Sequence, residues 1–477
     1  MISRIILRGS AALGVMAMAL ATVPAHAGTS EALLKRLHEK GILSDEDYNE
    51  LMAQEQAETA AAAAPVAAPA TATGKAQSNL DNSGDMGRMV KMTDTGIGLE
   101  VGPATIKFGG SVNGFYVHDN PDRASASTAV VGGIASVGAK NSSAVRNGLL
   151  PGYLTVSVST KQEGWDIGAF FGMYPGINST AYGALGANNG GQPTALGTAG
   201  IDFRQTYLTF GKPTVGTFKI GRDIGLFGSE AILNDITLLS SGTPGGNVAP
   251  GNTTLGRIGV GYIYTDFQPQ ITYTSPSFGG LQVSAGVFQP LSSLTGPAQE
   301  NSQPGFQGKV TYDGKLGGVA ARLWAGGVTQ KHDEVLGGSY TGRGLDFGGK
   351  VTAGPIAVTG YYYTAKGLGT TVFGLHDTDG LGNARKSDGF YLQALATFGK
   401  IAVGGSYGES ALHYANAADA IANPNLLDTN SSYVGQVRYS LTSWVTLIGE
   451  YVHSKAEAHS GNEASSDAMA LGGILFF

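Results

Sequence analysis

The residues of this chain that could do chemistry are charged side chains at alternate positions of apolar segments. Eight basic residues share the polar side of such segments: Lys107, Lys161, Arg204, Lys219, Lys309, Arg322, Lys350 and Arg438. Four acidic residues share it too: Asp166, Asp202, Asp346 and Glu450. Charges lining a narrow aqueous passage select ions, because a wall of low dielectric constant focuses their field. Alternatively, each of them only keeps a wide interior hydrated.

Arg222 is a special case among the basic residues. It falls on the apolar side, together with Phe218 and Ile220. A bulge or strand end at Gly221 would turn it toward the polar side. We therefore include Arg222 among the predicted wall residues.

Two short motifs that suggest an enzyme or a metal site are set aside. Residues 404–408 (GGSYG) match G-x-S-x-G, but they lie within a predicted strand and lack the strand-turn-helix context that exposes a nucleophile. Asp377, Asp379 and Asn383 suggest a calcium loop, yet the full ligand series with its terminal Glu is missing. The eight His residues show no metal-ligand spacing, and cysteine is absent. We expect no catalytic residue, no metal and no cofactor.

The composition indicates a large β protein. The 477 residues include 74 Gly, 20 Tyr and 18 Phe, and only 14% are charged. Tyr and Phe are enriched in strands, and the glycines lack the three-residue period of collagen. The net charge is −6, so no basic footprint suggests a nucleic-acid partner.

The N-terminal residues 1–27 are typical of an export signal. Arg4 and Arg8 precede an apolar run that ends in the small-x-small pattern of residues 25–27. A membrane anchor is the less favoured alternative, because the apolar run is short and ends in a cleavage pattern. No later apolar run is long enough for a transmembrane helix. If the exported chain spans a membrane, it must do so as a closed barrel.

Residues 28–59 are predicted to form a periplasmic helical hairpin, a coiled-coil-like module. Leu33, Leu34 and Leu37 recur at helical spacing, and Ser44 is placed to cap a second helix. The module either only spaces and solubilises the N-terminus, or it serves oligomerisation or contact with an envelope surface such as peptidoglycan. The second reading follows because short amphipathic helices need a partner surface. Residues 60–104 are predicted to be an Ala/Pro-rich linker.

From residue 105 to residue 477 the sequence alternates with a period of two, as in two-faced strands. Phe390 and Phe398 lie on one face, and at about 3.4 Å per residue and a tilt near 40° they are separated by roughly 20 Å across a membrane. That height fits the apolar band between two aromatic girdles. The opposite face of a later segment carries Ser432, Gln436 and Arg438, which favours a wet interior.

The connections between these segments alternate in length. Short connections fall at residues 162–164, 211–215, 276–279, 313–316, 353–355, 399–400 and 441–442. Long connections fall at residues 119–151, 175–200, 224–256, 290–304, 331–342, 366–387, 411–430 and 456–465. Short turns on one side and long loops on the other are typical of outer-membrane barrels. Merging residues 257–267 with 270–274 into one strand gives sixteen antiparallel strands, enough to enclose an aqueous channel.

The C-terminal strand makes the resemblance specific. Met469, Leu471, Gly473, Leu475 and Phe477 share one face and end the chain in an aromatic residue. Further matches are ITYTSPSFGGLQVSAGVF from residue 271, GTFKIGR from 216, SDGFYLQALATFGK from 387 and YVGQVRYSLTSWVTLIGEYVHSK from 433. Together these segments resemble bacterial general porins of the outer membrane. The helical module and the linker depart from the plain porin pattern.

The resemblance implies a homotrimer in outer-membrane lipid, inserted by the barrel-assembly machinery through Phe477. It also implies that the third long loop, residues 224–256, folds into the channel and narrows it. The segment GLFGSEAILND of that loop supplies Glu230 and Asp235, which we expect to face Arg204, Lys219 and Arg222 across the constriction. The alternative is a loop that lies on the surface.

The sequence thus predicts an all-β, sixteen-stranded antiparallel transmembrane barrel that passes ions and small polar solutes by diffusion. A channel selective for sugars or phosphate would add aromatic ladders or clustered arginines, and Tyr361 with Tyr363 is too little to argue for one. An outer-membrane enzyme would need a nucleophile and a base at the rim. A surface adhesin or structural β protein is the remaining alternative.

Overall fold

The computed structural model describes residues 90–92, 96–177, 201–245 and 253–477. The predicted signal peptide (1–27), the predicted helical module (28–59) and residues 60–89 of the predicted linker lie outside the described residues. Strands β1 (Val90–Met92) and β2 (Ile97–Val101) fall within the last part of that predicted linker. They pair with each other, and β2 pairs with the start of the barrel, from Ile97 opposite Phe108 to Val101 opposite Ala104.

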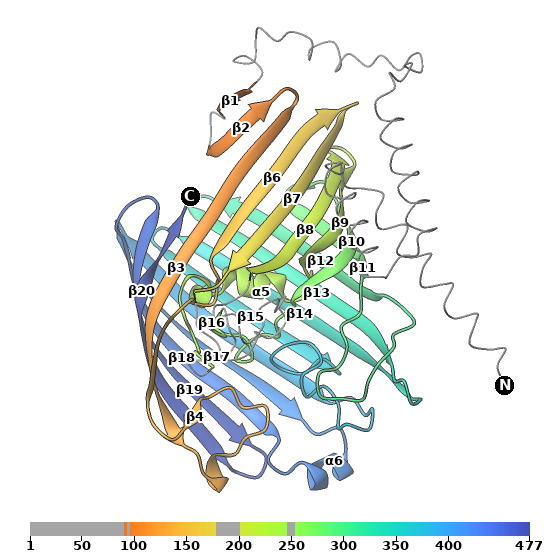
Figure 1. Ribbon diagram of the computed structural model, residues 1–477, viewed down its shortest axis with the longest axis vertical. Coiled ribbons are helices and arrows are strands. Elements are labelled where there is room, and N and C mark those ends of the chain that lie inside the picture. The colour runs from red at the N-terminus through yellow and green to blue at the C-terminus, as the bar shows by residue number, and fades with distance from the viewer. Residues whose placement is uncertain (1–89, 93–95, 178–200, 246–252) are drawn as a thin grey trace, which may run out of the picture. The chain divides into compact units, whose positions relative to one another are not determined.

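Sixteen strands form a closed antiparallel barrel, which confirms the predicted fold class (Figure 1). They are β3 (Ala104–Arg123), β6 (Tyr153–Gln162), β7 (Trp165–Pro175), β8 (Ile201–Lys212), β9 (Gly216–Ile224), β10 (Phe267–Thr274), β11 (Leu281–Phe288), β12 (Gly305–Leu316), β13 (Val319–Asp333), β14 (Ser339–Ala353), β15 (Ile356–Lys366), β16 (Lys386–Phe398), β17 (Ile401–His413), β18 (Leu427–Ser440), β19 (Val445–Ala458) and β20 (Glu463–Phe476). Each strand pairs with the next. Strand β20 pairs with β3, from Ser466 opposite Pro121 to Phe476 opposite Ser111, so the wall has no free edge.

The period-two pattern produces an apolar outer face and a polar inner face. On β14, Leu345 and Phe347 are more than half exposed, whereas Asp346 between them is buried. Apolar side chains that face outward suit acyl chains, and the closed wall satisfies every ladder hydrogen bond in hydrocarbon. Two rows of outer-face aromatic rings mark the limits of this band. Toward the short turns lie Trp165, Phe210, Phe218 and Tyr273, and toward the long loops lie Phe347, Tyr362, Phe390, Tyr407 and Tyr433.

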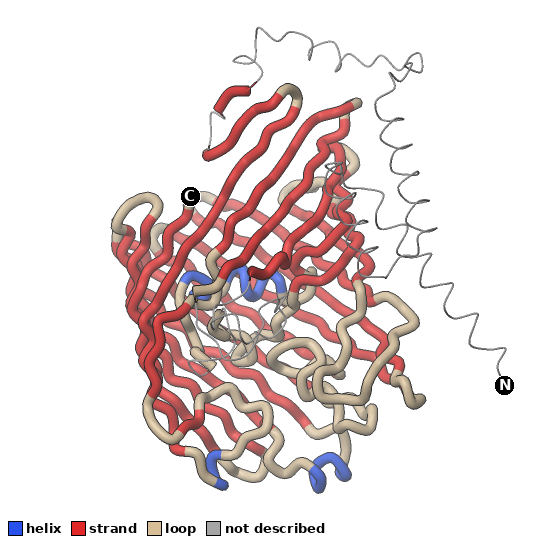
Figure 2. The backbone as a smooth tube through the Cα atoms, in the orientation of Figure 1, coloured by secondary structure: helices blue, strands red, loops and turns tan. Residues whose placement is uncertain are grey.

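The connections sort to the two ends of the barrel, here named the turn end and the loop end (Figure 2). Two of the predicted long loops are wrong. Strands β13 and β14 stay paired out to Asp333 opposite Ser339, so residues 334–338 form a tight turn instead of a loop over residues 331–342. Gly337 and Gly338 have positive φ, which this turn requires. Likewise, β19 and β20 leave only residues 459–462 unpaired, against the predicted loop at residues 456–465.

The merged strand over residues 257–274 is also wrong, although the strand count is right. Strand β10 begins at Phe267, and residues 257–266 belong to the preceding loop. Ile258, Val260, Tyr262 and Ile263 are all buried, so residues of both parities pack inward. The alternation of this segment reflects packing inside the barrel rather than a face toward lipid.

The remaining elements lie in the connections. They are η1 (Ala126–Thr128), β4 (Val137–Gly138), β5 (Ser142–Arg146), α5 (Ser229–Asn234), η2 (Ile236–Leu239) and α6 (Ala417–Ala422). Among the described residues, no helix has the length and apolar composition needed to cross a bilayer.

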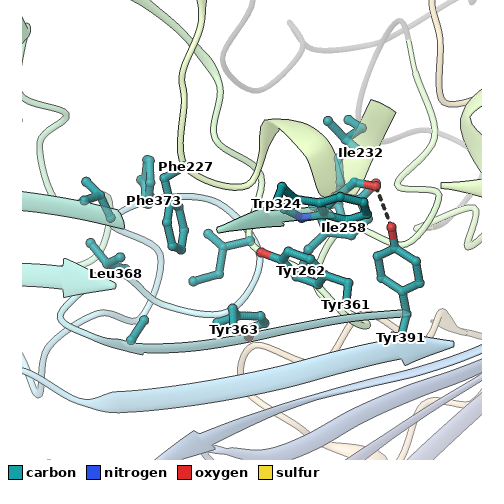
Figure 3. Close-up of a cluster of buried hydrophobic side chains, with 14 of the residues drawn as sticks. Phe227, Ile232, Ile258, Tyr262, Trp324, Tyr361, Tyr363, Leu368, Phe373 and Tyr391 are labelled. Carbon is teal, nitrogen blue, oxygen red and sulfur yellow. Dashed lines mark hydrogen bonds between the residues drawn. The ribbon is translucent and has the colours of Figure 1, made fainter. Parts of the chain in front are cut away.

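The main apolar cluster lies inside the barrel, where the connection between β9 and β10 packs on the wall (Figure 3). We call residues 225–266, as far as they are described, the inner loop. Phe227, Ile232 and Tyr262 of the inner loop pack with Trp324 of β13 and Tyr391 of β16. Burial of such aromatic surface holds the inner loop against the wall.

Candidate pore constriction

The inner loop is anchored to inward-facing residues of strands that are distant in sequence. The Tyr391 hydroxyl of β16 donates to the Ala231 carbonyl over 2.9 Å (Figure 3). Gln393 Oε1 accepts from the Ile236 amide at 2.9 Å, and Arg438 Nη2 donates to the Ile236 carbonyl at 2.6 Å. Helix α5 accordingly lies inside the barrel, and the inner loop does not lie on the outer surface (Figure 1).

Glu230 stands in the first turn of α5, which begins after Gly228 in a left-handed conformation. Its buried carboxylate accepts from Lys309 Nζ at 2.8 Å and from Arg322 Nε at 2.9 Å and Nη2 at 3.0 Å. The predicted contact with a basic wall is therefore made by Lys309 and Arg322, and not by Arg204, Lys219 or Arg222. The sequence indicated both partners as wall residues, but it could not show which strands the inner loop reaches.

The charge of Glu230 is stabilised by these partners. Burial alone would raise its pKa, but the hydrogen bonds from Arg322 and the charge of Lys309 outweigh burial and lower the pKa to about 2. Charge-assisted hydrogen bonds of this kind are among the strongest in proteins. Glu230 is therefore ionised at every physiological pH and fastens α5 to β12 and β13.

Asp235 sits in an enclosed pocket of the inner loop. Its carboxylate accepts from the Tyr262 hydroxyl at 2.9 Å and from the Thr237 amide and hydroxyl at 2.8 and 2.7 Å. Burial raises its pKa, and the charge of nearby Arg257 opposes that effect. Asp235 does not face the open bore as predicted, because Tyr262, further along the inner loop, packs against its carboxylate.

Arg257 is the residue that sequence reasoning missed at this point. Its side chain is buried, and its guanidinium donates to the Ser432 carbonyl at 3.3 Å and to the Val260 carbonyl at 3.4 Å. The residue was assigned to a predicted strand, so its charge was not linked to Asp235. A basic residue in an apolar alternating run is a signal that could have suggested a buried partner.

Glu450 and Arg438 were predicted as wall residues, and both anchor the inner loop. The buried Glu450 carboxylate accepts from Ser240 Oγ and the Gly242 amide, each at 2.6 Å. Gln436 Nε2 donates to the same carboxylate at 2.7 Å, and Gln436 Oε1 accepts a hydrogen bond from Arg438 Nε. These contacts hold Ser240 and Gly242 of the inner loop against β18 and β19.

The remaining predicted wall residues make different contacts. Lys219 pairs with Asp223, four residues further along β9, and lies 4.8 Å from the Tyr207 ring centre. Lys350 lies opposite Arg322 and Thr359. Lys107 and Lys161 are exposed toward the turn end, where Lys161 Nζ lies 3.4 Å from Asp166. Asp346 is buried beside α5 and accepts from the Gly228 amide at 3.3 Å. The Asp202 side chain lies outside the described part of the chain.

Arg222 lies on the outer face instead, and Arg204 stacks on aromatic rings. Arg222 lies opposite Pro269 and Thr206 in an unbroken register, is exposed, and shares the outer face with Ile220. Its Nη1 donates to the Phe267 carbonyl at 2.6 Å, so the expected inward turn at Gly221 does not occur. The Arg204 guanidinium lies over the Tyr174 and Phe267 rings, at 4.9 and 5.4 Å from their centres.

Residues of the two motifs set aside in the sequence make hydrogen bonds that stabilise the fold. Ser406 of the GGSYG segment is buried within β17, and its hydroxyl donates to the Leu392 carbonyl at 3.4 Å. Asp377 accepts from Ser293 Oγ at 2.6 Å and from the Tyr340 hydroxyl. Across the described residues, no group of three or more His, Asp or Glu side chains is placed to hold a metal ion.

Comparison with known proteins agrees with this geometry. The sequence profile of the Gram-negative porin family matches residues 57–459. Two of the solved structures with a similar fold are outer-membrane channels. The outer-membrane channel DcaP of Acinetobacter baumannii is 15% identical, with a TM-score of 0.58 over 81% of this chain and 99% of its own. The anion-selective porin from Comamonas acidovorans is 14% identical, with a TM-score of 0.53 over 78% of this chain and 100% of its own.

No curated protein sequence matches the chain. The family match covers most of the barrel. This chain therefore belongs to the Gram-negative porin family and is a channel of the outer membrane through which solutes diffuse.

Proposed function

We propose that the inner loop narrows the bore and that the narrowed passage admits small hydrophilic solutes and ions, with a preference for anions. The observation that carries the proposal is the attachment of Glu230 to Lys309 and Arg322. This ion-paired cluster brings α5 against the inner wall without leaving the loop's carboxylate free. No step of catalysis is part of the proposal.

The preference for anions follows from which charges are already compensated. Three acidic side chains at this level are buried in contacts: Glu230 with two bases, Asp223 with Lys219, and Glu450 with Ser240. A fourth acid, Asp313, is exposed and pairs with Arg322 at 2.6 Å. The bases keep exposed surface, with 35% of the Arg322 side chain and 30% of the Lys219 side chain accessible. A wall of exposed cations favours anions in a narrow passage.

The experiment is a reversal-potential measurement on the purified protein in a planar bilayer under a potassium chloride gradient. We expect the sign of the potential to show chloride as the more permeant ion. Lys350→Gln should reduce that preference, whereas Lys400→Gln, at the turn between β16 and β17, should not. A cation-selective potential would overturn the preference, and a silent bilayer would move the assignment toward a surface adhesin.

A channel selective for sugars is less well supported. Tyr262 of the inner loop gathers with Tyr361, Tyr363 and Tyr391 of the wall, but all four are buried where the loop packs on the wall. Aromatic rings must be accessible to stack on a sugar. Swelling of proteoliposomes in neutral sugars of increasing size would test the point, and saturable uptake of one sugar would favour the selective channel.

Family membership further suggests a homotrimer, a cleaved signal peptide, barrel insertion through Phe477 and a periplasmic module over residues 28–59 that contacts an envelope surface such as peptidoglycan. Phe477 closes the barrel, since its amide and carbonyl bond to Gly110 at 3.0 and 3.1 Å. Native mass spectrometry should give three copies, each beginning at Gly28. A monomer, or a chain beginning at Met1, would remove the corresponding part of the proposal.

A further inference from the structure

Basic residues form a row across four neighbouring strands near the loop end. Arg343 of β14 lies opposite Lys366 of β15, Lys366 opposite Lys386 of β16, and Lys386 opposite His413 of β17. Directly opposed residues of antiparallel strands project from the same face of the sheet. At about 4.8 Å between strands, the row spans roughly 15 Å.

The row lies on the outer face of the barrel. Arg343 has the parity of the exposed Leu345 and Phe347, and the residues next to the row on the other parity, Gly344, Ala365 and Ser387, are buried. The row therefore does not line the bore. Its side chains face whatever surrounds the barrel at this height.

That height is set by the aromatic row on the same strands. Phe347, Tyr362 and Phe390 lie four residues from Arg343, Lys366 and Lys386 toward the turn end, and the Phe347 and Tyr362 rings are 5.4 Å apart. Outer-face aromatic rings sit at the boundary between hydrocarbon and headgroups. Four residues of a strand tilted by about 40° rise roughly 10 Å, so the basic row stands at the level of the headgroups.

Among the residues that the structure describes, three of the four members of this row make no ion pair with a neighbouring acid. Within the described parts of the chain, Arg343, Lys366 and Lys386 have no ion-pair partner, whereas His413 pairs with Asp388 at 2.9 Å. The adjacent sector behaves differently. There Lys455 pairs with both Glu457 and Glu463, and His453 pairs with Asp467.

We infer that Arg343, Lys366 and Lys386 form a binding site for the phosphate groups of an anionic lipid in the surrounding leaflet. An Arg guanidinium binds phosphate through paired hydrogen bonds, and Lys adds point charges on flexible stems that can follow a mobile headgroup. Each basic residue at an anionic membrane surface strengthens binding by about fivefold. The site is on the outer wall, so it goes beyond the proposed function of the bore and does not depend on it.

The test uses the full-length protein in neutral detergent, titrated with phosphatidic acid and followed by native mass spectrometry. We expect the wild type to retain this lipid and the triple variant Arg343→Gln, Lys366→Gln, Lys386→Gln to bind it on the order of a hundredfold more weakly. A matched triple variant at the turn end, Lys212→Gln, Lys315→Gln, Lys400→Gln, removes the same charge and should bind as the wild type does. Phosphatidylcholine, which has no net charge, should not distinguish the three proteins.

Three results would overturn the inference. Equal binding of phosphatidic acid by the wild type and the outer-row variant would remove the site. Equal weakening by the turn-end variant would reduce the effect to overall charge. Displacement of the lipid by the same concentration of free glycerol phosphate would show a site for soluble phosphate instead of a lipid site.

Channel measurements separate this inference from the proposed function. The outer-row variant should keep the wild-type conductance and reversal potential, because its residues do not face the bore. A changed reversal potential would place the row inside the passage and contradict the inference, whatever the lipid measurement shows. Conversely, an anion preference that fails to appear in the wild type leaves the lipid test intact.

Discussion

The two acidic residues of the inner loop look alike in the sequence, yet the structure places them in opposite surroundings. Glu230 meets two long basic side chains of the wall that keep part of their surface in the bore. Asp235 accepts hydrogen bonds from a tyrosine and a threonine of its own loop, and the charge of the buried Arg257 in the same loop acts on it. The first contact joins the loop to the barrel, and the second holds the loop together.

This difference separates selectivity from stability. A charge partly open to the bore alters the field that ions experience, whereas a buried pair mainly determines whether the loop keeps its shape. We therefore expect changes at the Asp235 site to affect the order of the loop, and changes at the Glu230 site to affect both its attachment and the permeant ion.

The largest effect should come from Arg257→Met, which leaves Asp235 buried without its cationic neighbour. The substitution also leaves the Ser432 and Val260 carbonyls without their donor, and each buried group left unsatisfied costs about 1–3 kcal/mol. Hydrogen exchange of the amides of residues 253–264 should report that loss as faster local opening. Arg222→Met, on the outer face, is the matched control, and equal exchange in the two variants would contradict the assigned role of Arg257.

Glu230→Gln should have the next largest effect. It removes the charge that accepts three hydrogen bonds from Lys309 and Arg322, each of which is of the charged kind. We expect the attachment of α5 to weaken by about 2 kcal/mol. The freed bases should move the reversal potential further toward chloride, and a shift toward potassium would contradict the assignment.

Asp235→Asn should be milder, because an amide oxygen can still accept from Thr237 and Tyr262. The expected cost is about 1–2 kcal/mol, visible in hydrogen exchange of the inner loop. Its reversal potential should match that of the wild type, whereas loss of a carboxylate that faced the constriction, as the sequence predicted for Asp235, would shift the potential toward anions. A clear shift would return Asp235 to the bore.

The smallest change is expected on acidification between pH 7 and pH 4. The pKa of Glu230 in the folded protein, about 2, lies below its ordinary value of 4.5. The ion pair is therefore fully present above the ordinary value and is lost only as the pH falls through the lowered one. Hydrogen exchange should report opening of α5 with a midpoint near pH 2 and not near pH 4.5. The Glu230→Gln variant should lack this transition.

The wall could be predicted from the sequence, because lipid outside and water inside act on every second residue. Phe390 and Leu392 face outward, while Tyr391 and Gln393 face inward, as the period-two pattern predicts. The pattern is less reliable where protein surrounds both faces of a segment. Residues 257–266 alternate like a strand, but they pack inside the barrel. Because the segment was assigned to a strand, Arg257 was not recognised as part of the inner loop.

The constriction could be predicted only in outline. An acidic loop against a basic wall was foreseen, but its partners depend on where the loop crosses the barrel, which no local pattern encodes. Glu230 reaches Lys309 and Arg322, 79 and 92 residues further along the chain. Arg222 was misplaced because the expected bulge is absent. Glu450 faces inward as predicted, but the sequence did not show that the inner loop binds its carboxylate.

The most direct test of the water-filled bore uses two adjacent residues of β14 that point to opposite faces. The chain has no cysteine, so Lys350→Cys and Val351→Cys each carry a single thiol. A membrane-impermeant, negatively charged thiol reagent should modify Lys350→Cys in a bilayer and reduce its chloride current, and it should leave Val351→Cys unchanged. Equal modification of both thiols, or modification of Val351→Cys alone, would contradict an aqueous interior lined by Lys350.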